Sequence, residues 1–259
     1  MYRLIILWVF VLIGSVSVAQ ISVIAHRGAS YLAPENTLAS INLAWELGAD
    51  AVEIDVHLSA DMRIMVIHDP NTKRVSTWDV SFTVAESTAE QLRAMDVGSH
   101  KSAKYAGEKI PFLEEVLETV SEGKFLVIEI KCGEEIIPYL KKAVDESGKM
   151  EQLVFISFDW ETILAAHEAF PQNRSYYLKM LPFGLASKMR KAAELGLTGV
   201  NLYHGIINPE LMKKASLLGL EVLAWTVDNP ATVLRLEKLG VKAITTNRPG
   251  WMRKQIEGS

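Results

Sequence analysis

Two histidines, each beside another charged residue, could move protons in this chain. His26 precedes Arg27, and His68 precedes Asp69. Because an imidazole titrates near neutral pH, such a pair can serve as general base and general acid. Arg27 and Lys131 add positive charge that suits a phosphate group. These residues predict proton transfer at an anionic substrate, although their spacing does not distinguish a phosphodiester from another anion.

Three carboxylates complete the set, and we call them the carboxylate triad: Glu53, Asp55 and Glu129. Glu53 and Asp55 alternate along one apolar run, so their side chains share one face of a strand. Converging carboxylates repel one another unless a cation lies between them, and oxygen ligands favour Ca2+ or Mg2+. We therefore expect one divalent cation here. The alternative is a structural ion network in which Arg27 and Lys131 neutralise the triad.

Short apolar runs that alternate with helical patterns must position these residues. The strand-like runs are Ser22–Ala25, Ala51–Val56, Phe125–Ile130, Leu153–Ser157, Ser175–Leu178, Gly199–Leu202, Glu221–Thr226 and Ala243–Thr245. The helical patterns are Thr37–Leu47, Leu113–Ser121, Glu134–Ser147, Trp160–Ala169, Leu185–Leu195, Pro209–Leu218 and Pro230–Leu239. This alternation implies parallel strands, and eight of them predict an α/β fold closed as a (β/α)8 TIM barrel. Active sites of such barrels lie at the C-terminal strand ends, where the charged residues stand.

One segment departs from the alternation. Ile64–Ile67 resembles a strand, but too few residues precede it for the helical crossover that a parallel strand requires. We predict instead a β-hairpin that returns His68 to the barrel mouth, with Ser59-Ala60-Asp61 near its tip. Residues 70–111 contain no clear barrel strand, so we expect a small insertion over the same face.

The first twenty residues differ in composition from the rest. Arg3 is their only charge, Leu4–Ile13 is apolar, and a stretch of small residues ends at Ala19. This pattern predicts a signal peptide over residues 1–19 and one barrel domain over residues 20–259, placed in the periplasm or outside the cell. The apolar run is short for a membrane span, so we expect none after cleavage, and a retained anchor is the alternative.

The overall composition narrows the choice of partners. The chain has 27 basic and 31 acidic residues, a net charge of −4, which argues against nucleic acid as a partner. Its single cysteine, Cys132, excludes an intrachain disulfide, and we expect a packed, unreactive thiol. None of this fixes the oligomeric state.

Eight segments in order carry a resemblance to a known family. They are IAHRGAS (Ile24–Ser30), APENTLAS (Ala33–Ser40), GADAVEIDVHLSAD (Gly48–Asp61), VIHDP (Val66–Pro70), AGEKIPFLEEVLE (Ala106–Glu118), IEIK (Ile128–Lys131), AWTVD (Ala224–Asp228) and ITTNRP (Ile244–Pro249). From about Val23 to about Pro249 the chain resembles the glycerophosphodiester phosphodiesterases, which are similar in mechanism to phosphatidylinositol-specific phospholipases C. Any one segment is a weak signal, but eight in this order are a strong one.

The resemblance implies a reaction and roles for the residues above. The carboxylate triad would bind the metal, the two histidines would be the acid/base pair, and Arg27 and Lys131 would contact the phosphate. A substrate hydroxyl would attack phosphorus, and water would open the resulting cyclic phosphate. The expected substrate is a small phosphodiester, released as glycerol 3-phosphate and an alcohol such as choline or ethanolamine.

Several further residues are expected to support the site. Trp225 is expected to wall the substrate pocket, with simple core packing as the alternative, and Glu35 to orient Arg27. Asn36 is expected to cap the helix that follows it. Asn247 stands where the family commonly has aspartate, which removes one charge from the mouth. His57 lies either on the same face as the triad or at the base of the hairpin, and the sequence leaves both open.

Two other functions remain in view. A lysophospholipase D or phospholipase C-like enzyme would keep the chemistry but act on lipids, and would need an apolar rim, which we expect around Trp78 and Phe82. A non-catalytic protein that binds phosphodiesters would need neither histidine, so the presence of both favours an enzyme.

Overall fold

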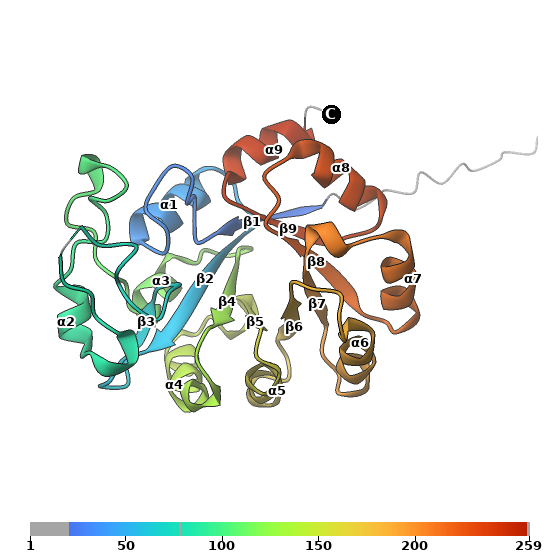
Figure 1. Ribbon diagram of the computed structural model, residues 1–259, viewed down its shortest axis with the longest axis horizontal. Helices are drawn as coiled ribbons and strands as arrows, with labels where there is room; N and C mark the ends of the chain where they lie inside the picture. Colours follow the sequence, from blue (N-terminus) through green and yellow to red (C-terminus); the bar gives the residue numbers. More distant parts are fainter. Residues whose placement is uncertain (1–20, 78, 258–259) are drawn as a thin grey trace, which may run out of the picture.

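Eight parallel strands close into a barrel in the computed structural model, which describes residues 21–77 and 79–257 (Figure 1). The strands are β1 (Ser22–His26), β2 (Ala51–Leu58), β4 (Phe125–Ile130), β5 (Leu153–Ser157), β6 (Arg174–Lys179), β7 (Gly199–Tyr203), β8 (Glu221–Trp225) and β9 (Ala243–Thr246). Strand β1 pairs with both β2 and β9, which closes the ring. The predicted (β/α)8 barrel is therefore confirmed.

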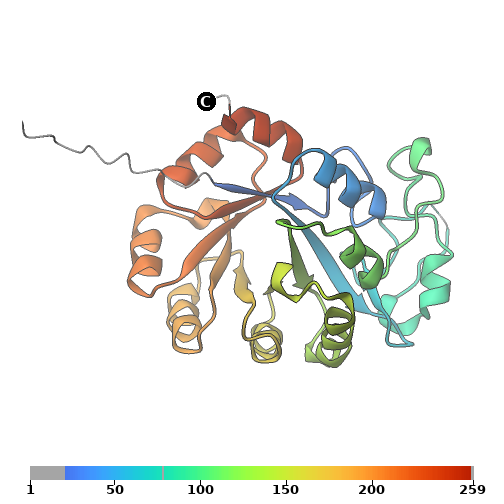
Figure 2. The same ribbon diagram turned by 180° about the vertical axis from the view of Figure 1, so that it is seen from behind.

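Helices surround the strands on the outside (Figures 1 and 2). They are α1 (Leu38–Glu46), α3 (Leu113–Thr119), α4 (Ile137–Ser147), α5 (Trp160–Ala169), α6 (Leu185–Glu194), α7 (Pro209–Leu217), α8 (Pro230–Lys238) and α9 (Pro249–Glu257). Local capping fixes several starts: the side chain of Asn208 accepts a hydrogen bond from the backbone of Leu211, and Asn229 accepts one from Ala231. Helix α9 follows the last strand and was not predicted.

The inner face of the barrel changes character along each strand. At the N-terminal end an apolar layer fills the interior, and it includes Ile24, Val127 and Leu223. Toward the C-terminal end the same face carries charge, because alternation along β2 turns Glu53 and Asp55 inward. The alternate residues of β2 pack outward in the main core beneath the helices. The alternation of side chains along the strands therefore places the polar site at the C-terminal end of the barrel, above the apolar interior.

The hairpin lies where the sequence predicts it. Strand β3 (Ile64–Val66) runs antiparallel to β2, and the backbone N–H of Ser59 donates to the carbonyl of Arg63 across the turn. Met62 in that turn has a φ of 60°. Because the hairpin reverses the chain direction, His68 returns to the C-terminal end of the barrel.

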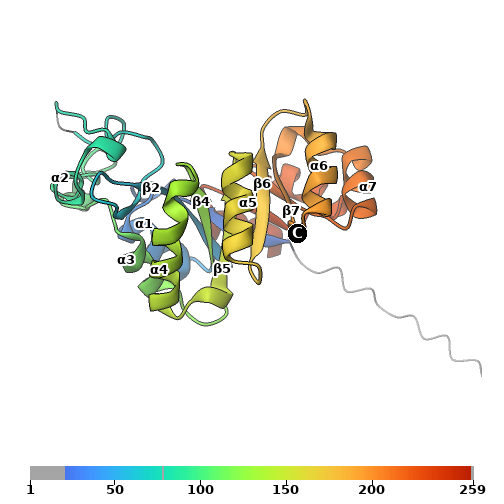
Figure 3. The same ribbon diagram turned by 90° about the horizontal axis from the view of Figure 1, so that it is seen from below.

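The insertion has a small core of its own. Helix α2 (Ala89–Arg93) and the loops around it bury Met65, Leu92 and Met95 together, and Phe82 packs against them. Figure 3 shows this part of the chain at one end of the molecule, next to α1 and β2. Phe82 therefore does not form an exposed apolar rim, and Trp78 lies outside the described residues, as does the predicted signal peptide.

No helix among residues 21–77 and 79–257 combines the length and apolar character needed to cross a membrane.

Candidate active site

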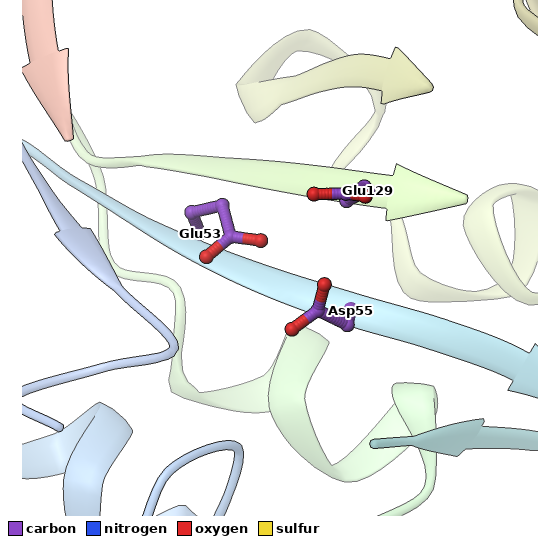
Figure 4. Close-up of side chains that lie close together, drawn as sticks. All are labelled: Glu53, Asp55 and Glu129. Atoms are coloured by element: carbon purple, nitrogen blue, oxygen red, sulfur yellow. The ribbon is translucent and has the colours of Figure 1, made fainter. Parts of the chain in front are cut away.

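The carboxylate triad comes together at the C-terminal end of the barrel. Asp55 on β2 and Glu129 on β4 are partners in the parallel register, and Glu53 lies one inward position earlier on β2. One oxygen from each of the three carboxylates lies within 4.8 Å of the others, and all three side chains are buried (Figure 4). The convergence predicted from strand alternation is thus present.

Two oxygens of the triad are buried without a hydrogen-bond partner: Oε1 of Glu53 and Oδ1 of Asp55. Burial and the charges of Asp55 and Glu129 raise the pKa of Glu53 well above its usual range. Burial and the charge of Asp55 likewise raise the pKa of Glu129 to about 7. The charged forms of these carboxylates are disfavoured because three negative groups lie close together away from water. A hard divalent cation between them would remove that repulsion.

Two cations approach the triad but do not balance it. Lys131 Nζ lies 2.6 Å from Oε1 of Glu129 and 3.7 Å from Oδ1 of Asp55. Arg27 Nε lies 3.2 Å from Oδ2 of Asp55, while Nη1 of the same side chain pairs with Glu35 at 2.9 Å. Three carboxylates therefore share one lysine and part of one arginine. The ion-network alternative explains Glu129 well, but Glu53 has only the backbone N–H of Arg27 as a hydrogen-bond donor to Oε2 and none to Oε1. The residues therefore fit a metal ion.

His26 stands at the end of β1 with a neutral partner. Its Nδ1 lies 2.7 Å from Oδ1 of Asn247, an atom that only accepts, so Nδ1 carries the proton and Nε2 has the free lone pair. Burial and the adjacent charge of Arg27 lower the pKa of His26 to about 4. His26 is therefore neutral at physiological pH, as a general base must be.

His68 has a charged partner instead. Its Nδ1 lies 2.6 Å from Oδ1 of Asp69, and its Nε2 lies 3.2 Å from Nζ of Lys131. Arg74, from the insertion, donates to both oxygens of Asp69, and this bonding lowers the pKa of Asp69 to about 2. The Asp69 carboxylate accepts from Nδ1–H of His68 and so fixes the orientation of the ring, which leaves Nε2 in contact with Lys131.

The comparisons with known proteins agree with this geometry. A sequence model of the glycerophosphoryl diester phosphodiesterase family matches residues 26–251. The chain belongs to that family. A glycerophosphodiester phosphodiesterase of Caldanaerobacter subterraneus is 34% identical over 88% of this chain and 94% of its own length. One of Bacillus subtilis is 27% identical, over 92% and 87% respectively.

A solved structure is similar as well. A phosphodiesterase of Oleispira antarctica, in complex with the product sn-glycerol-3-phosphate, superposes with a TM-score of 0.84 at 29% identity. The alignment covers 92% of this chain and 97% of that one. As a member of the family, the chain is a glycerophosphodiester phosphodiesterase.

In this phosphodiesterase Arg74 links the carboxylate that contacts His68 to the carboxylate that contacts Arg27. Besides Asp69, it donates to both oxygens of Glu35, each at 2.8 Å. Glu35 in turn accepts from Arg27, which confirms the expected contact, and these cations hold the pKa of Glu35 at about 2 against the effect of burial. No sequence pattern pointed to Arg74, because it lies in the insertion, which has no helical or strand periodicity.

The expectation for Asn36 was wrong. Thr37 is the N-cap of α1, and its hydroxyl accepts from the backbone of Ser40 at 3.3 Å. Asn36 has a φ of 55°, which turns its side chain away from the helix, and its Nδ2 donates to Oδ2 of Asp55 at 2.8 Å. The amide oxygen also accepts from the backbone N–H of Asp55, so Asn36 fixes the orientation of a triad carboxylate.

Two other residues of the phosphodiesterase are mainly structural by their contacts. His57 is buried at the hairpin, and its Nε2 lies 3.1 Å from the backbone oxygen of His68, so it supports the return strand. Cys132 is half-buried, and burial raises the pKa of its thiol to about 11. A thiol protonated at neutral pH is not a nucleophile, in line with the expectation.

Trp225 ends β8 among other aromatic side chains. Its ring centroid lies 5.4 Å from that of Phe158 and 6.0 Å from that of Tyr203, and its Nε1 donates to the carbonyl of Asn201. Phe158 in turn lies 5.8 Å from Lys131 Nζ. Trp225 thus stands at the mouth, and whether it contacts substrate remains a prediction.

The amide at Asn247 leads to a prediction about pH. With the pKa of His26 near 4, and with the divalent cation kept saturating at every pH, we expect kcat/KM to stay level down to about pH 5. An Asn247→Asp variant would place a carboxylate against Nδ1, favour the imidazolium and raise the pKa of His26. The acid limb of the pH–rate profile should then move upward by about one pH unit.

Asp228 provides the control. It accepts from Nδ2 of Asn247 at 2.6 Å, so a carboxylate at position 247 would meet another one there. The double variant Asn247→Asp/Asp228→Asn removes that repulsion and should show the larger displacement. A profile that is the same in the wild type and both variants would contradict the pairing of His26 with Asn247.

Proposed function

We propose that this phosphodiesterase hydrolyses deacylated glycerophosphodiesters, such as glycerophosphocholine, to glycerol 3-phosphate and the free alcohol. The single observation that carries the proposal is the meeting of the carboxylate triad with two histidines whose partners differ, one neutral and one charged. The Oleispira antarctica relative bound to sn-glycerol-3-phosphate supports the product.

In the first step His26 is the base. Its free Nε2 removes the proton from the glycerol 2-hydroxyl, whose oxygen then forms a bond to phosphorus. The bond from phosphorus to the alcohol oxygen breaks, and His68 donates a proton to that oxygen. The neutral partner suits His26 as the base, and Asp69 holds the ring of His68 through Nδ1, which leaves its Nε2 to deliver the proton. The result is a cyclic phosphate and the free alcohol.

In the second step the roles reverse. His68, now neutral, removes a proton from water, whose oxygen forms a bond to phosphorus while the bond from phosphorus to the 2-oxygen breaks, and His26 returns a proton to that 2-oxygen. Arg27 and Lys131 supply positive charge beside the phosphate oxygens, and Lys131 can exchange its contact with His68 for one with the substrate. A divalent cation held by Glu53, Asp55 and Glu129 would stabilise negative charge on the same oxygens.

The test is product release from glycerophosphocholine and glycerophosphoethanolamine by purified protein that begins at Gln20. We expect glycerol 3-phosphate to form with added Ca2+ or Mg2+, and 31P NMR to show a transient cyclic phosphate resonance. Glycerol 3-phosphate without any cyclic species, under conditions that resolve it, would remove the intermediate but keep the substrate. Binding of glycerophosphocholine without any product would point to the non-catalytic alternative.

A further inference from the structure

One arginine of the insertion contacts the site through two carboxylates that are not part of the triad. Arg74 donates from Nη1 and Nη2 to the two oxygens of Glu35, and from Nε and Nη2 to the two oxygens of Asp69. These bonds use all three nitrogens of a planar group, so they fix direction as well as distance. Arg74 therefore holds both carboxylates in one orientation relative to each other.

Glu35 connects this arginine to Arg27. Its Oε1 accepts from Nη1 of Arg27 at 2.9 Å, and Nε of Arg27 lies 3.2 Å from Oδ2 of Asp55. Neither contact uses Nη2 of Arg27, which can therefore turn to a phosphate oxygen. Because Arg74 bonds to both oxygens of Glu35, that carboxylate is not free to rotate into a two-point contact with Arg27, which would cover Nη2.

Asp69 connects the same arginine to His68. Its Oδ1 accepts from Nδ1 of His68 at 2.6 Å, and bonding to Arg74 lowers the pKa of Asp69 to about 2, so the carboxylate is ionised and accepts at both oxygens. A carboxylate that is fixed in this way also fixes the imidazole ring. Nε2 of His68, which lies 3.2 Å from Nζ of Lys131, is the atom that donates to the leaving alcohol in the proposed mechanism.

We propose that Arg74 is a positioning residue for two groups of the reaction at once. Through Glu35 it presents Arg27 to the phosphate. Through Asp69 it directs Nε2 of His68 at the leaving oxygen. This inference rests on the proposed function, from which it takes the roles of Arg27 and His68. Without Arg74 the two carboxylates lose their shared cation, and each is free to move together with the group that it holds.

A second arginine of the insertion supplies the matched control. Arg93, the last residue of α2, donates to both oxygens of Glu115 on α3 and to the backbone carbonyl of Ile110. Glu115 also accepts from the backbone N–H of Phe112 and not from a residue of the site. Arg93 thus attaches the insertion to a barrel helix, so Arg93→Ala should lower Tm and leave kcat and KM within about twofold of wild type.

The main experiment compares Arg74→Ala with wild type on glycerophosphocholine and on the p-nitrophenyl diester of glycerol 3-phosphate. We expect kcat for glycerophosphocholine to fall about 10–100-fold, because small misplacements of reacting groups have effects of this size. Release of p-nitrophenolate in the first turnover should fall at least about fivefold less, because a phenolate leaves without a proton from His68. Guanidinium ion, added below denaturing concentrations, should partly restore kcat of Arg74→Ala and leave wild type unchanged.

Further variants make the test independent of any folding defect in Arg74→Ala. Arg74→Lys keeps a charge between the carboxylates but lacks the planar fork, so it should fold and still lose about threefold to tenfold in kcat. Asp69→Ala removes the connection to His68, and adding Arg74→Ala to it should cost less than Arg74→Ala costs in wild type. Glu35→Ala should chiefly raise KM, because it acts through Arg27.

The outcomes separate this inference from the proposed function. Equal losses on both substrates in Arg74→Ala, without rescue by guanidinium, would mean that Arg74 only attaches the insertion, and the inference would be overturned. Wild-type kinetics in Arg74→Ala would overturn it as well, and both results would leave the proposed function standing. A wild type that turns over neither substrate would remove the proposed function, and this inference with it.

Discussion

Replacing His26 or His68 by alanine should lower kcat for glycerophosphocholine by about 10²–10⁴-fold, because in the proposed mechanism each imidazole transfers a proton. Neither change should unfold the protein, since both side chains lie at the barrel mouth rather than in its apolar core. Steady-state assays with saturating divalent cation, together with thermal unfolding of each variant, check both statements.

The two histidines should differ when the leaving group changes. A p-nitrophenyl diester of glycerol 3-phosphate expels a phenolate that needs no proton, so release of p-nitrophenolate by His68→Ala in the first turnover should recover to within about tenfold of wild type. His26→Ala should remain impaired, because the glycerol hydroxyl still requires a base. Recovery of His26→Ala in place of His68→Ala would reverse the two assignments.

His57 supplies the matched control for these variants. It lies on the same strand face as Asp55, yet the hydrogen-bond partner of its ring is the backbone oxygen of His68 and not a residue of the triad. A His57→Gln variant keeps an N–H that can donate to that oxygen, so we expect less than about a tenfold loss of kcat. A loss as large as that of His68→Ala would place His57 in the chemistry.

Removal of the divalent cation is the second large effect. We expect EDTA to abolish turnover, a loss of at least about 10³-fold, and Ca2+ or Mg2+ to restore it. In the Glu53→Gln variant, added Ca2+ or Mg2+ should not restore turnover, since Oε1 of Glu53 is one of the two buried triad oxygens without a hydrogen-bond partner. Activity that survives exhaustive chelation would favour the ion-network alternative for the triad.

Cation binding should also depend on pH with a definite sign. Crowding raises the pKa of Glu129 to about 7 and that of Glu53 well above its usual range, so both carboxylates hold protons in acid. Cations must displace those protons, and affinity should fall as pH falls through about 7. The rise in Tm on adding Ca2+ or Mg2+ is therefore expected to be large at about pH 8 and small at about pH 5.

Replacing Glu221 tests whether the loss of any carboxylate on a barrel strand has the same effect as the loss of Glu53. It begins β8 at the opposite end of the barrel and accepts from the Tyr176 hydroxyl at 2.6 Å. A Glu221→Gln variant keeps an oxygen that can accept this bond. We expect the same response of Tm to cation as in wild type, whereas Glu53→Gln should lose it. Equal responses in both variants would contradict a cation site at the triad.

The barrel and its chemistry could be predicted from local information. Strands and helices follow from hydrophobic period, and several predicted bounds match the structure, as for Phe125–Ile130 and Trp160–Ala169. The same alternation turns Glu53 and Asp55 to one face, and parallel register brings Glu129 beside them. The hairpin was predictable because the chain is too short there for a crossover.

Tertiary structure alone decided which groups support the site. Arg74 donates to Asp69 and Glu35 from an insertion that has no hydrophobic periodicity, so no sequence pattern predicts its position. Asn36 contacts Asp55 because its backbone adopts a φ of 55°, which a composition-based capping rule does not foresee. Met180, Leu181 and Phe183 are likewise exposed on the loop after β6, where the sequence shows residue type but not exposure. The hydrophobic periodicity of a strand or helix predicts which face each side chain lies on. Contacts between distant segments depend on how the loops pack, and loop packing is determined only when the whole chain folds.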